Sequence, residues 1–151
     1  MNTPKLRFKE FTGEWKISKL ADCARFQQGV QVDLDLQKKE VKEGFVKFLR
    51  IENYTQLSND FRFIDNKISK GKKINKNEIA IVRYGASAGF IARGHEGVLA
   101  NNLFKLIVNN NEIDYDYLYQ YLKRDKVYSF FQAEMAGGAM PALSFEIVKR
   151  L

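Results

Sequence analysis

The hydrophobic pattern of this chain changes its period once, near Asp114, and this change constrains the fold more than any other feature of the sequence. Before Asp114, short segments rich in aromatic and β-branched residues either alternate between apolar and polar positions or are almost wholly apolar, as strands are. These segments span residues 45–51, 61–64, 78–84, 90–93 and 103–108. The third of them is nearly all apolar until its end, which predicts a buried central strand.

Apart from a single helical turn predicted at residues 20–23, helical spacing begins after Asp114, a residue type that often caps the N-terminus of a helix. Four apolar residues then share one helix face, namely Tyr117, Leu118, Tyr121 and Leu122. A second helical stretch over 126–135 ends at Gly137-Gly138, and Ser144 can cap a short third helix. Because strands come first and helices last, we expect an α+β fold. It should have a curved, mainly antiparallel sheet in the N-terminal two-thirds, with helices from the C-terminal third packed on it.

Composition narrows the class of protein. A length of 151 residues favours a single domain over residues 1–151. One cysteine excludes an internal disulfide and fits a reducing cytosol, and one histidine leaves too few Cys and His ligands for a structural zinc. The sequence has no apolar signal segment at its start and no stretch near the roughly 18 apolar residues of a membrane span. We therefore expect a cytoplasmic protein with no membrane partner.

No motif in the sequence favours catalysis. Cys23 and His95 are a possible nucleophile and base, but the apolar neighbours of Cys23 are typical of a core residue. Asp22 followed by residues 40–42 has the residue types of a metal-dependent nuclease, but residues 40–42 lie in a charged stretch without a strand pattern. No phosphate-binding glycine motif and no Pro-Pro motif of amino-methyltransferases occur. We expect a non-enzyme, with no catalytic residues and no metal ligands.

Positive charge is concentrated in one part of the chain. The net charge is +7, and residues 67–105, with eight Lys or Arg against two Asp or Glu, contribute +6 of it. This block opens with five lysines in ten residues, at Lys67, Lys70, Lys72, Lys73 and Lys76. Such a concentration is typical of a surface that binds nucleic acid. A solvated lysine-rich hairpin that only aids solubility is the alternative, and charge alone does not decide between the two.

An ordered set of motifs runs through the chain. It comprises Leu6-Arg7-Phe8, Phe11, Gly13-Glu14-Trp15, Leu20-Ala21-Asp22, Gly29, residues 48–54, residues 79–89, Asn101-Asn102-Leu103-Phe104 and residues 137–144. In this order and at these intervals the motifs resemble one target-recognition domain of the specificity (S) subunit of type I restriction–modification enzymes. The resemblance spans residues 4–151. An S subunit of this family continues into a helical spacer and a second such domain, so the chain resembles a fragment or a half-subunit.

The resemblance implies non-catalytic, sequence-specific binding of double-stranded DNA, with each domain reading one half of a split target. It also implies two protein partners, a methyltransferase (modification) subunit and an endonuclease/translocase subunit, and self-association if the chain is a half-subunit. S-adenosylmethionine, ATP and Mg²⁺ would belong to those partners, and this chain would hold no cofactor. Two other functions stay open: a catalytic fragment of a nuclease or methyltransferase, and a protein-interaction module that does not bind DNA.

Base reading needs polar side chains held rigidly at strand and loop ends. Arg83, at the end of the predicted central strand, is the first candidate, with Tyr84 and Ser87 on the glycine-rich turn that follows. The second-rank candidates are Gln28, Gln31, Asn53, Arg93 and His95. The lysines at 67, 70, 72, 73 and 76 suit contacts to phosphates, which position a duplex without reading it. Alternatives remain: Arg83 paired with a carboxylate, His95 as an exposed loop residue, and residues 138–143 as either a DNA-approaching loop or a structural link.

Overall fold

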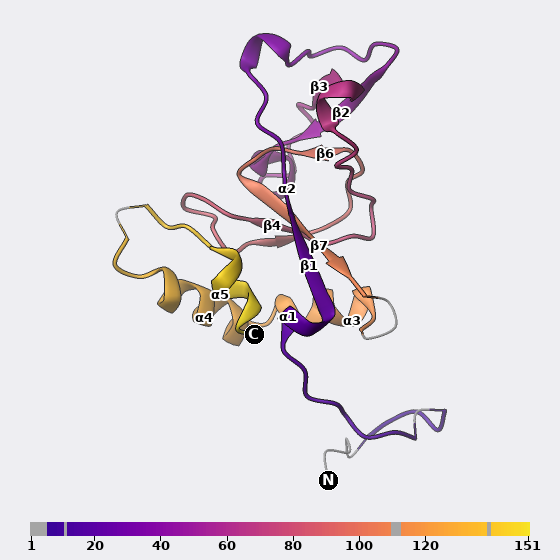
Figure 1. Cartoon of the computed structure of the whole chain (residues 1–151), viewed down its shortest axis with the longest axis vertical. Coiled ribbons are helices and arrows are strands. Elements are labelled where there is room, and N and C mark those ends of the chain that lie inside the picture. The colour runs from indigo at the N-terminus through magenta and orange to yellow at the C-terminus, as the bar shows by residue number, and fades with distance from the viewer. Residues whose placement is uncertain (1–5, 11, 110–112, 139) are drawn as a thin grey trace.

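A four-stranded antiparallel sheet forms the middle layer of the structure, a computed structural model that describes residues 6–10, 12–109, 113–138 and 140–151 (Figure 1). Its strands lie in the order β1 (Ala24–Gln28), β7 (Leu103–Val108), β4 (Ala80–Val82) and β5 (Ile91–Ala92). Phe104 on β7 lies opposite Gln28 on β1 and opposite Ile81 on β4. The strand predicted over 103–108 is confirmed, and those predicted over 78–84 and 90–93 form over shorter spans.

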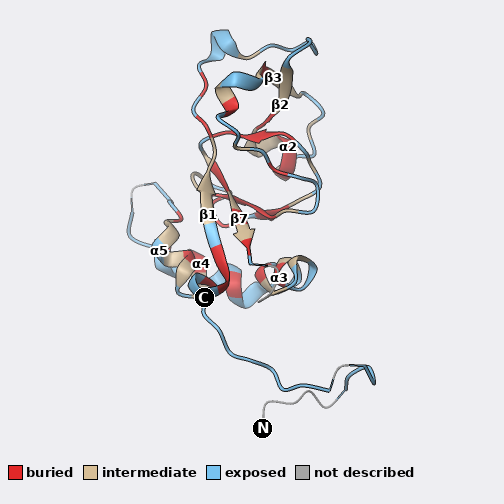
Figure 2. Cartoon of the chain, turned by 45° about the vertical axis from the view of Figure 1, so that its right-hand side comes forward, coloured by how far each residue is buried: buried red, intermediate tan, exposed pale blue. Residues whose placement is uncertain are grey.

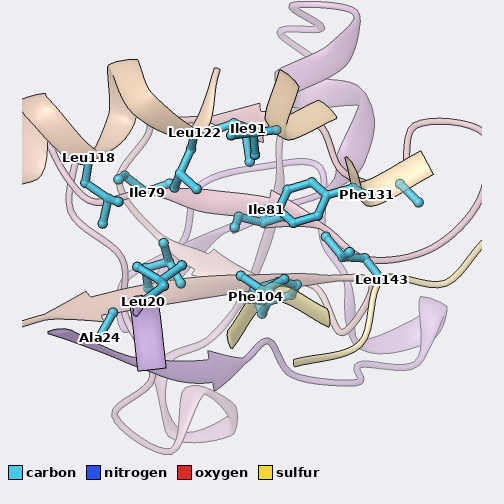
Figure 3. Close-up of a cluster of buried hydrophobic side chains, with 14 of the residues drawn as sticks. Leu20, Ala24, Ile79, Ile81, Ile91, Phe104, Leu118, Leu122, Phe131 and Leu143 are labelled. Carbon is cyan, nitrogen blue, oxygen red and sulfur yellow. The ribbon is translucent and has the colours of Figure 1, made fainter. Parts of the chain in front are cut away.

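The two faces of this sheet carry different apolar side chains, because alternate residues of a strand point to opposite faces. One face packs against the helices through Ile79, Ile81 and Phe104 (Figure 3), and Leu106 belongs to the same cluster. The other face presents Ala80, Val82 and Leu103 to a separate cluster that includes Leu49 and Leu99. Burial on both faces explains why residues 79–82 are all apolar.

A second sheet of three strands covers that other face, with the order β3 (Arg62–Asp65), β2 (Phe45–Leu49) and β6 (Val98–Leu99). The central strand β2 pairs antiparallel with β3 and parallel with β6. The short helix α2 (Ile51–Thr55) follows β2, and two 3-10 turns lie at η1 (Leu34–Leu36) and η2 (Asn66–Ser69). In Figure 1 this sheet lies at the opposite end of the body from the C-terminal helices.

The helices cover the first face of the four-stranded sheet; they are α1 (Leu20–Cys23), α3 (Tyr115–Leu122), α4 (Asp125–Met135) and α5 (Phe145–Lys149). Both predicted caps form, since Asp114 Oδ1 accepts from the Tyr117 amide at 2.9 Å and Ser144 Oγ accepts from the Ile147 amide at 3.2 Å. Leu118 and Leu122 are buried as the helical spacing predicts, but Tyr117 is 46% exposed.

The predicted α+β class with mainly antiparallel strands is confirmed, but the strands are divided between two sheets rather than one. The sequence pattern missed β1 and β6, whose apolar residues are too few to show a period. It also extended the strand at 45–51 too far, because residue 51 begins a helix. There Asn53 Oδ1 accepts from the Arg50 amide at 2.8 Å and stabilises the first turn.

The described N-terminal residues before α1 are exposed and lead away from the body (Figure 2). The body begins at Leu20, whose amide donates to the carbonyl of Leu151 at 2.8 Å, so residues 20 and 151 lie side by side. Among the described residues, no helix combines the length and the hydropathy that crossing a membrane requires.

Candidate nucleic-acid interface

The ends of β1 and β4 bring together Gln28 and Arg83, two predicted base-reading residues that are 55 positions apart. Both strands pair with β7, so their ends lie on either side of its first residues. Arg83 Nη1 donates to Gln28 Oε1 at 2.5 Å, and Arg83 Cζ lies 4.9 Å from the ring centre of Tyr84 and 5.2 Å from that of Phe145. The guanidinium is therefore held from three sides, and no carboxylate of the described residues pairs with it.

The amide of Gln28 is committed to contacts inside the domain. Its Nε2 donates to the carbonyls of Asn101 and Leu103, the latter at 3.3 Å, while its Oε1 accepts from Arg83. This arrangement fixes which end of the amide faces the arginine. Gln28 thus positions Arg83 in the structure, and both ends of its amide are bonded within the domain.

The turn after Arg83 is tight and is held by the chain near the C-terminus. The amide of Gly89 donates to the carbonyl of Val82 at 2.9 Å, and Gly85 and Gly89 have φ of +83° and +92°, a conformation that favours glycine. Backbone bonds from Leu143 to Arg83 at 2.8 Å and from Gly85 to Pro141 at 3.2 Å join the turn to the segment before α5. Tyr84 and Ser87 on this turn are half-buried.

These backbone bonds give residues 141–143 a structural role beside the turn. Met140, just before them, is 67% exposed and is not part of these contacts. Residue 139 lies outside the described residues.

Asn53 is fully buried in α2, which contradicts its prediction as a base-reading residue. Its Oδ1 accepts from the Arg50 amide and its Nδ2 donates to the Ser58 carbonyl at 3.0 Å, so both ends of its amide are bonded within the domain. The sequence pattern did not indicate this role, because it predicts a strand up to residue 51 and therefore no helix that Asn53 could cap.

Arg93 and His95 are half-buried and packed against neighbouring side chains. Arg93 forms an ion pair with Asp116 and lies 4.2 Å over the ring of Tyr119. The ring of His95 lies 5.1 Å from that of Tyr54 and 5.4 Å from that of Phe61, and its Nε2 is 3.2 Å from the Asn53 carbonyl. Neither side chain projects from a loop into solvent, because each is packed against its neighbours. Gln31 is exposed and lines a shallow hollow with Arg50, Asn101 and Asn102.

Among the described titratable side chains, burial shifts the pKa of a tyrosine most. It raises the pKa of the Tyr54 phenol, whose hydroxyl has no hydrogen-bond partner in the described structure. Burial also raises the pKa of Tyr115, although the amide of Val108 donates to its hydroxyl at 3.1 Å.

The five predicted phosphate-binding lysines divide into two kinds. Lys67, Lys70, Lys73 and Lys76 are exposed, whereas Lys72 is half-buried and its Nζ donates to the Gln28 carbonyl at 3.2 Å. Lys72 therefore joins the lysine-rich segment to the end of β1, beside Arg83. Across the described part of the chain, no group of three or more His, Cys, Asp or Glu side chains is arranged to hold a metal ion.

The chain is similar to a known family of proteins and to one of its curated members. Residues 12–151 match the family described as the type I restriction modification DNA specificity domain. Among curated proteins the chain is similar to the type I restriction enzyme MjaVIII specificity subunit of Methanocaldococcus jannaschii, with 27% identity over 154 residues covering 95% of this chain and 34% of that one. The chain thus spans about a third of the length of this relative.

Solved structures show the same fold. The S subunit of a type I restriction–modification system from M. genitalium is 15% identical, with a TM-score of 0.63 over 98% of this chain and 36% of that chain. The HsdS subunit from Thermoanaerobacter tengcongensis is 12% identical, with a TM-score of 0.60 over 89% and 31%. At these identities the likeness concerns the fold alone. With the match over residues 12–151, the chain belongs to the type I restriction modification DNA specificity domain family.

Proposed function

We propose that this chain binds double-stranded DNA sequence-specifically and reads one half of a bipartite target for a type I restriction–modification complex. The observation that carries the proposal is the match of residues 12–151 to a family described by DNA specificity. The excess of +6 within residues 67–105 supports it, because a basic surface attracts the phosphate backbone regardless of sequence.

Within this proposal, Arg83 is the principal base-reading residue. An arginine fork recognises a guanine edge with two parallel hydrogen bonds, which requires a fixed orientation. Gln28, Tyr84 and Phe145 supply that orientation, and the glycines of the following turn allow backbone to approach a groove closely. Tyr84, Ser87 and exposed Gln31 would add contacts at the rim, whereas Arg93 and His95 would first have to leave their present partners.

The chain is proposed to be non-catalytic and to act as one recognition unit in the cytoplasm. S-adenosylmethionine, ATP and Mg²⁺ would be held by a methyltransferase subunit and an endonuclease/translocase subunit, which are its proposed protein partners. A second copy of the chain would be a further partner if the chain acts as a half-subunit.

Selection from a pool of randomised duplexes tests the DNA-binding function. We expect a short partial-site motif to be enriched, and the selected duplex to be bound more tightly than its scrambled version at two salt concentrations. Absence of any enriched motif, together with affinity that does not depend on salt, would contradict the proposal. Methyl transfer or cleavage by the chain alone, on adding S-adenosylmethionine or Mg²⁺, would favour the catalytic alternative.

A further inference from the structure

A hollow of about 600 Å³ lies between β2, the segment 73–76 and the loop 94–97. Its charged lining consists of Lys47, Lys73, Lys76 and Glu96, beside Asn75 and His95. Three ammonium groups against one carboxylate leave an excess of positive charge. Only two of these lysines belong to the lysine-rich run, because Lys47 comes from β2, about 30 residues earlier in the chain.

Backbone contacts hold the walls of this hollow together. Ile74 and Gly97 exchange two hydrogen bonds, of 2.8 and 3.1 Å, and the amide of Gly94 donates to the carbonyl of Lys76 at 2.9 Å. Gly97 also lies so close to β2 that a Cβ atom there would overlap the carbonyl oxygen of Lys47. The three segments that carry the lysines are therefore fixed relative to one another.

The segment 73–76 is also anchored from β7. Lys105 Nζ donates to the carbonyl of Lys73 at 2.6 Å and pairs with Glu78, whose Oε2 accepts from the amide of Asn75 at 2.7 Å. Every one of these anchors uses the backbone of residues 73–76. None of these contacts among the described residues uses the ammonium group of Lys73 or Lys76.

The lysine charges in the hollow stay available. Lys47 Nζ lies 4.1 Å over the ring of Phe61, a contact that orients an ammonium without neutralising it. None of the ion pairs in the described structure involves Lys47, Lys73 or Lys76. Lys105 differs, because Glu78 balances its charge.

We propose that Lys47, Lys73 and Lys76 form a pre-organised site for phosphate groups of the DNA backbone. This inference rests on the proposed DNA-binding function and assigns the phosphate contacts to these three lysines rather than to the whole run. The segment also adjoins the base-reading candidate, because Lys72 Nζ bonds to the carbonyl of Gln28 at 3.2 Å. Phosphates held in the hollow would set the register in which Arg83 meets a base edge.

Salt-dependent binding to a duplex of random sequence tests the assignment. The triple variant Lys47→Gln, Lys73→Gln, Lys76→Gln removes three charges at the hollow. Each phosphate contact contributes roughly 0.9 to the slope of log K against log salt, so we expect the steepness to fall by about 2 to 3. The matched control, Lys67→Gln with Lys70→Gln, removes exposed lysines of the same run outside the hollow and should leave the slope nearly unchanged. If the slope changed equally per charge removed in the triple variant and in the control variant, the inference would be overturned.

A second measurement separates this site from the proposed function. Inorganic phosphate, followed by NMR, should shift the backbone amides of residues 73–77 and 94–97, and the triple variant should lose these shifts while keeping an otherwise unchanged spectrum. Phosphate binding without duplex binding would retain the site and contradict the proposed function. Duplex binding with no effect of the three lysines would contradict the site alone, and absence of both would contradict both.

Discussion

Lys105 and Glu78 form an ion pair that joins β7 to the chain just before β4, with Lys105 Nζ 2.9 Å from Glu78 Oε1. Their side chains are only 12% and 16% exposed, so little water screens the pair. The same ammonium group bonds to the carbonyl of Lys73, which links the pair to the lysine-rich segment.

Breaking this pair should destabilise the domain. Glu78→Gln leaves the Lys105 charge largely buried without a counter-charge, and we expect a loss of about 2–3 kcal/mol in the free energy of unfolding measured in urea. The control is Lys149→Met, which removes an exposed pair with Glu146 and should cost less than about 0.5 kcal/mol. Equal losses of unfolding free energy in both variants would show that the Lys105–Glu78 pair stabilises the domain no more than an exposed pair does.

Arg83→Lys should reduce base discrimination while leaving general DNA affinity nearly unchanged. Lysine keeps the charge but has no planar fork, so the preference for a selected duplex over its scrambled version should fall by about 1–3 kcal/mol. Gln28→Ala should act in the same direction, because Gln28 orients the guanidinium. Arg25→Lys, at an exposed position of β1, serves as control. A uniform loss for both duplexes would show that Arg83 contacts phosphate or only supports the fold.

Asn53→Ala should lower stability without changing base preference. The variant loses the bond that caps α2 and the bond to Ser58, and we expect a cost of about 2 kcal/mol in thermal or urea unfolding. Asn59→Ala, at an exposed position, should be nearly neutral. If the folded variant showed a changed ratio of affinities for the selected and the scrambled duplex, Asn53 would be a base-reading residue after all.

Gly29→Ala should be strongly destabilising for a purely steric reason. A Cβ atom at Gly29 would overlap the carbonyl oxygens of Leu99 and Ala100, and the backbone there does not have a positive φ. Rigid backbone cannot move aside cheaply, so we expect a loss of about 2 kcal/mol or more by urea denaturation. Gly13→Ala has open space around it and should leave the unfolding midpoint unchanged.

Tyr54→Phe should stabilise the domain, and more so in alkali. Removing a buried hydroxyl that lacks a partner should gain about 1 kcal/mol at neutral pH, whereas Tyr115→Phe, which loses the bond from the Val108 amide, should lower stability.

The pH trend follows from the raised pKa of Tyr54. Since this pKa is higher in the folded than in the unfolded chain, where it is about 10, the unfolded state releases the proton first. The stability of the parent chain should therefore fall as pH rises above about 10, and Tyr54→Phe should lessen that fall. If the stabilities of the parent chain and of Tyr54→Phe fell in parallel with rising pH, Tyr54 would not be the group responsible for the fall.

Features that depend on residues a few positions apart could be predicted from the sequence. The run of apolar and β-branched residues in 103–108 predicts β7, and the caps at Asp114 and Ser144 predict the starts of α3 and α5. The position of the excess charge is likewise a property of the sequence. Such signals need no knowledge of packing, because each is set by local backbone geometry or by side-chain chemistry.

Tertiary structure alone decided which distant residues meet. Gln28 reaches Arg83 because β1 and β4 flank β7 in one register, and Lys47 joins Lys73 and Lys76 because Gly97 packs against β2. Asn53 is a buried cap because α2 packs, through Ile51 and Tyr54, into the apolar cluster shared by the two sheets. Strand pairing and close backbone packing are set by the whole core, whereas periodicity reports only which face of its own element a residue occupies.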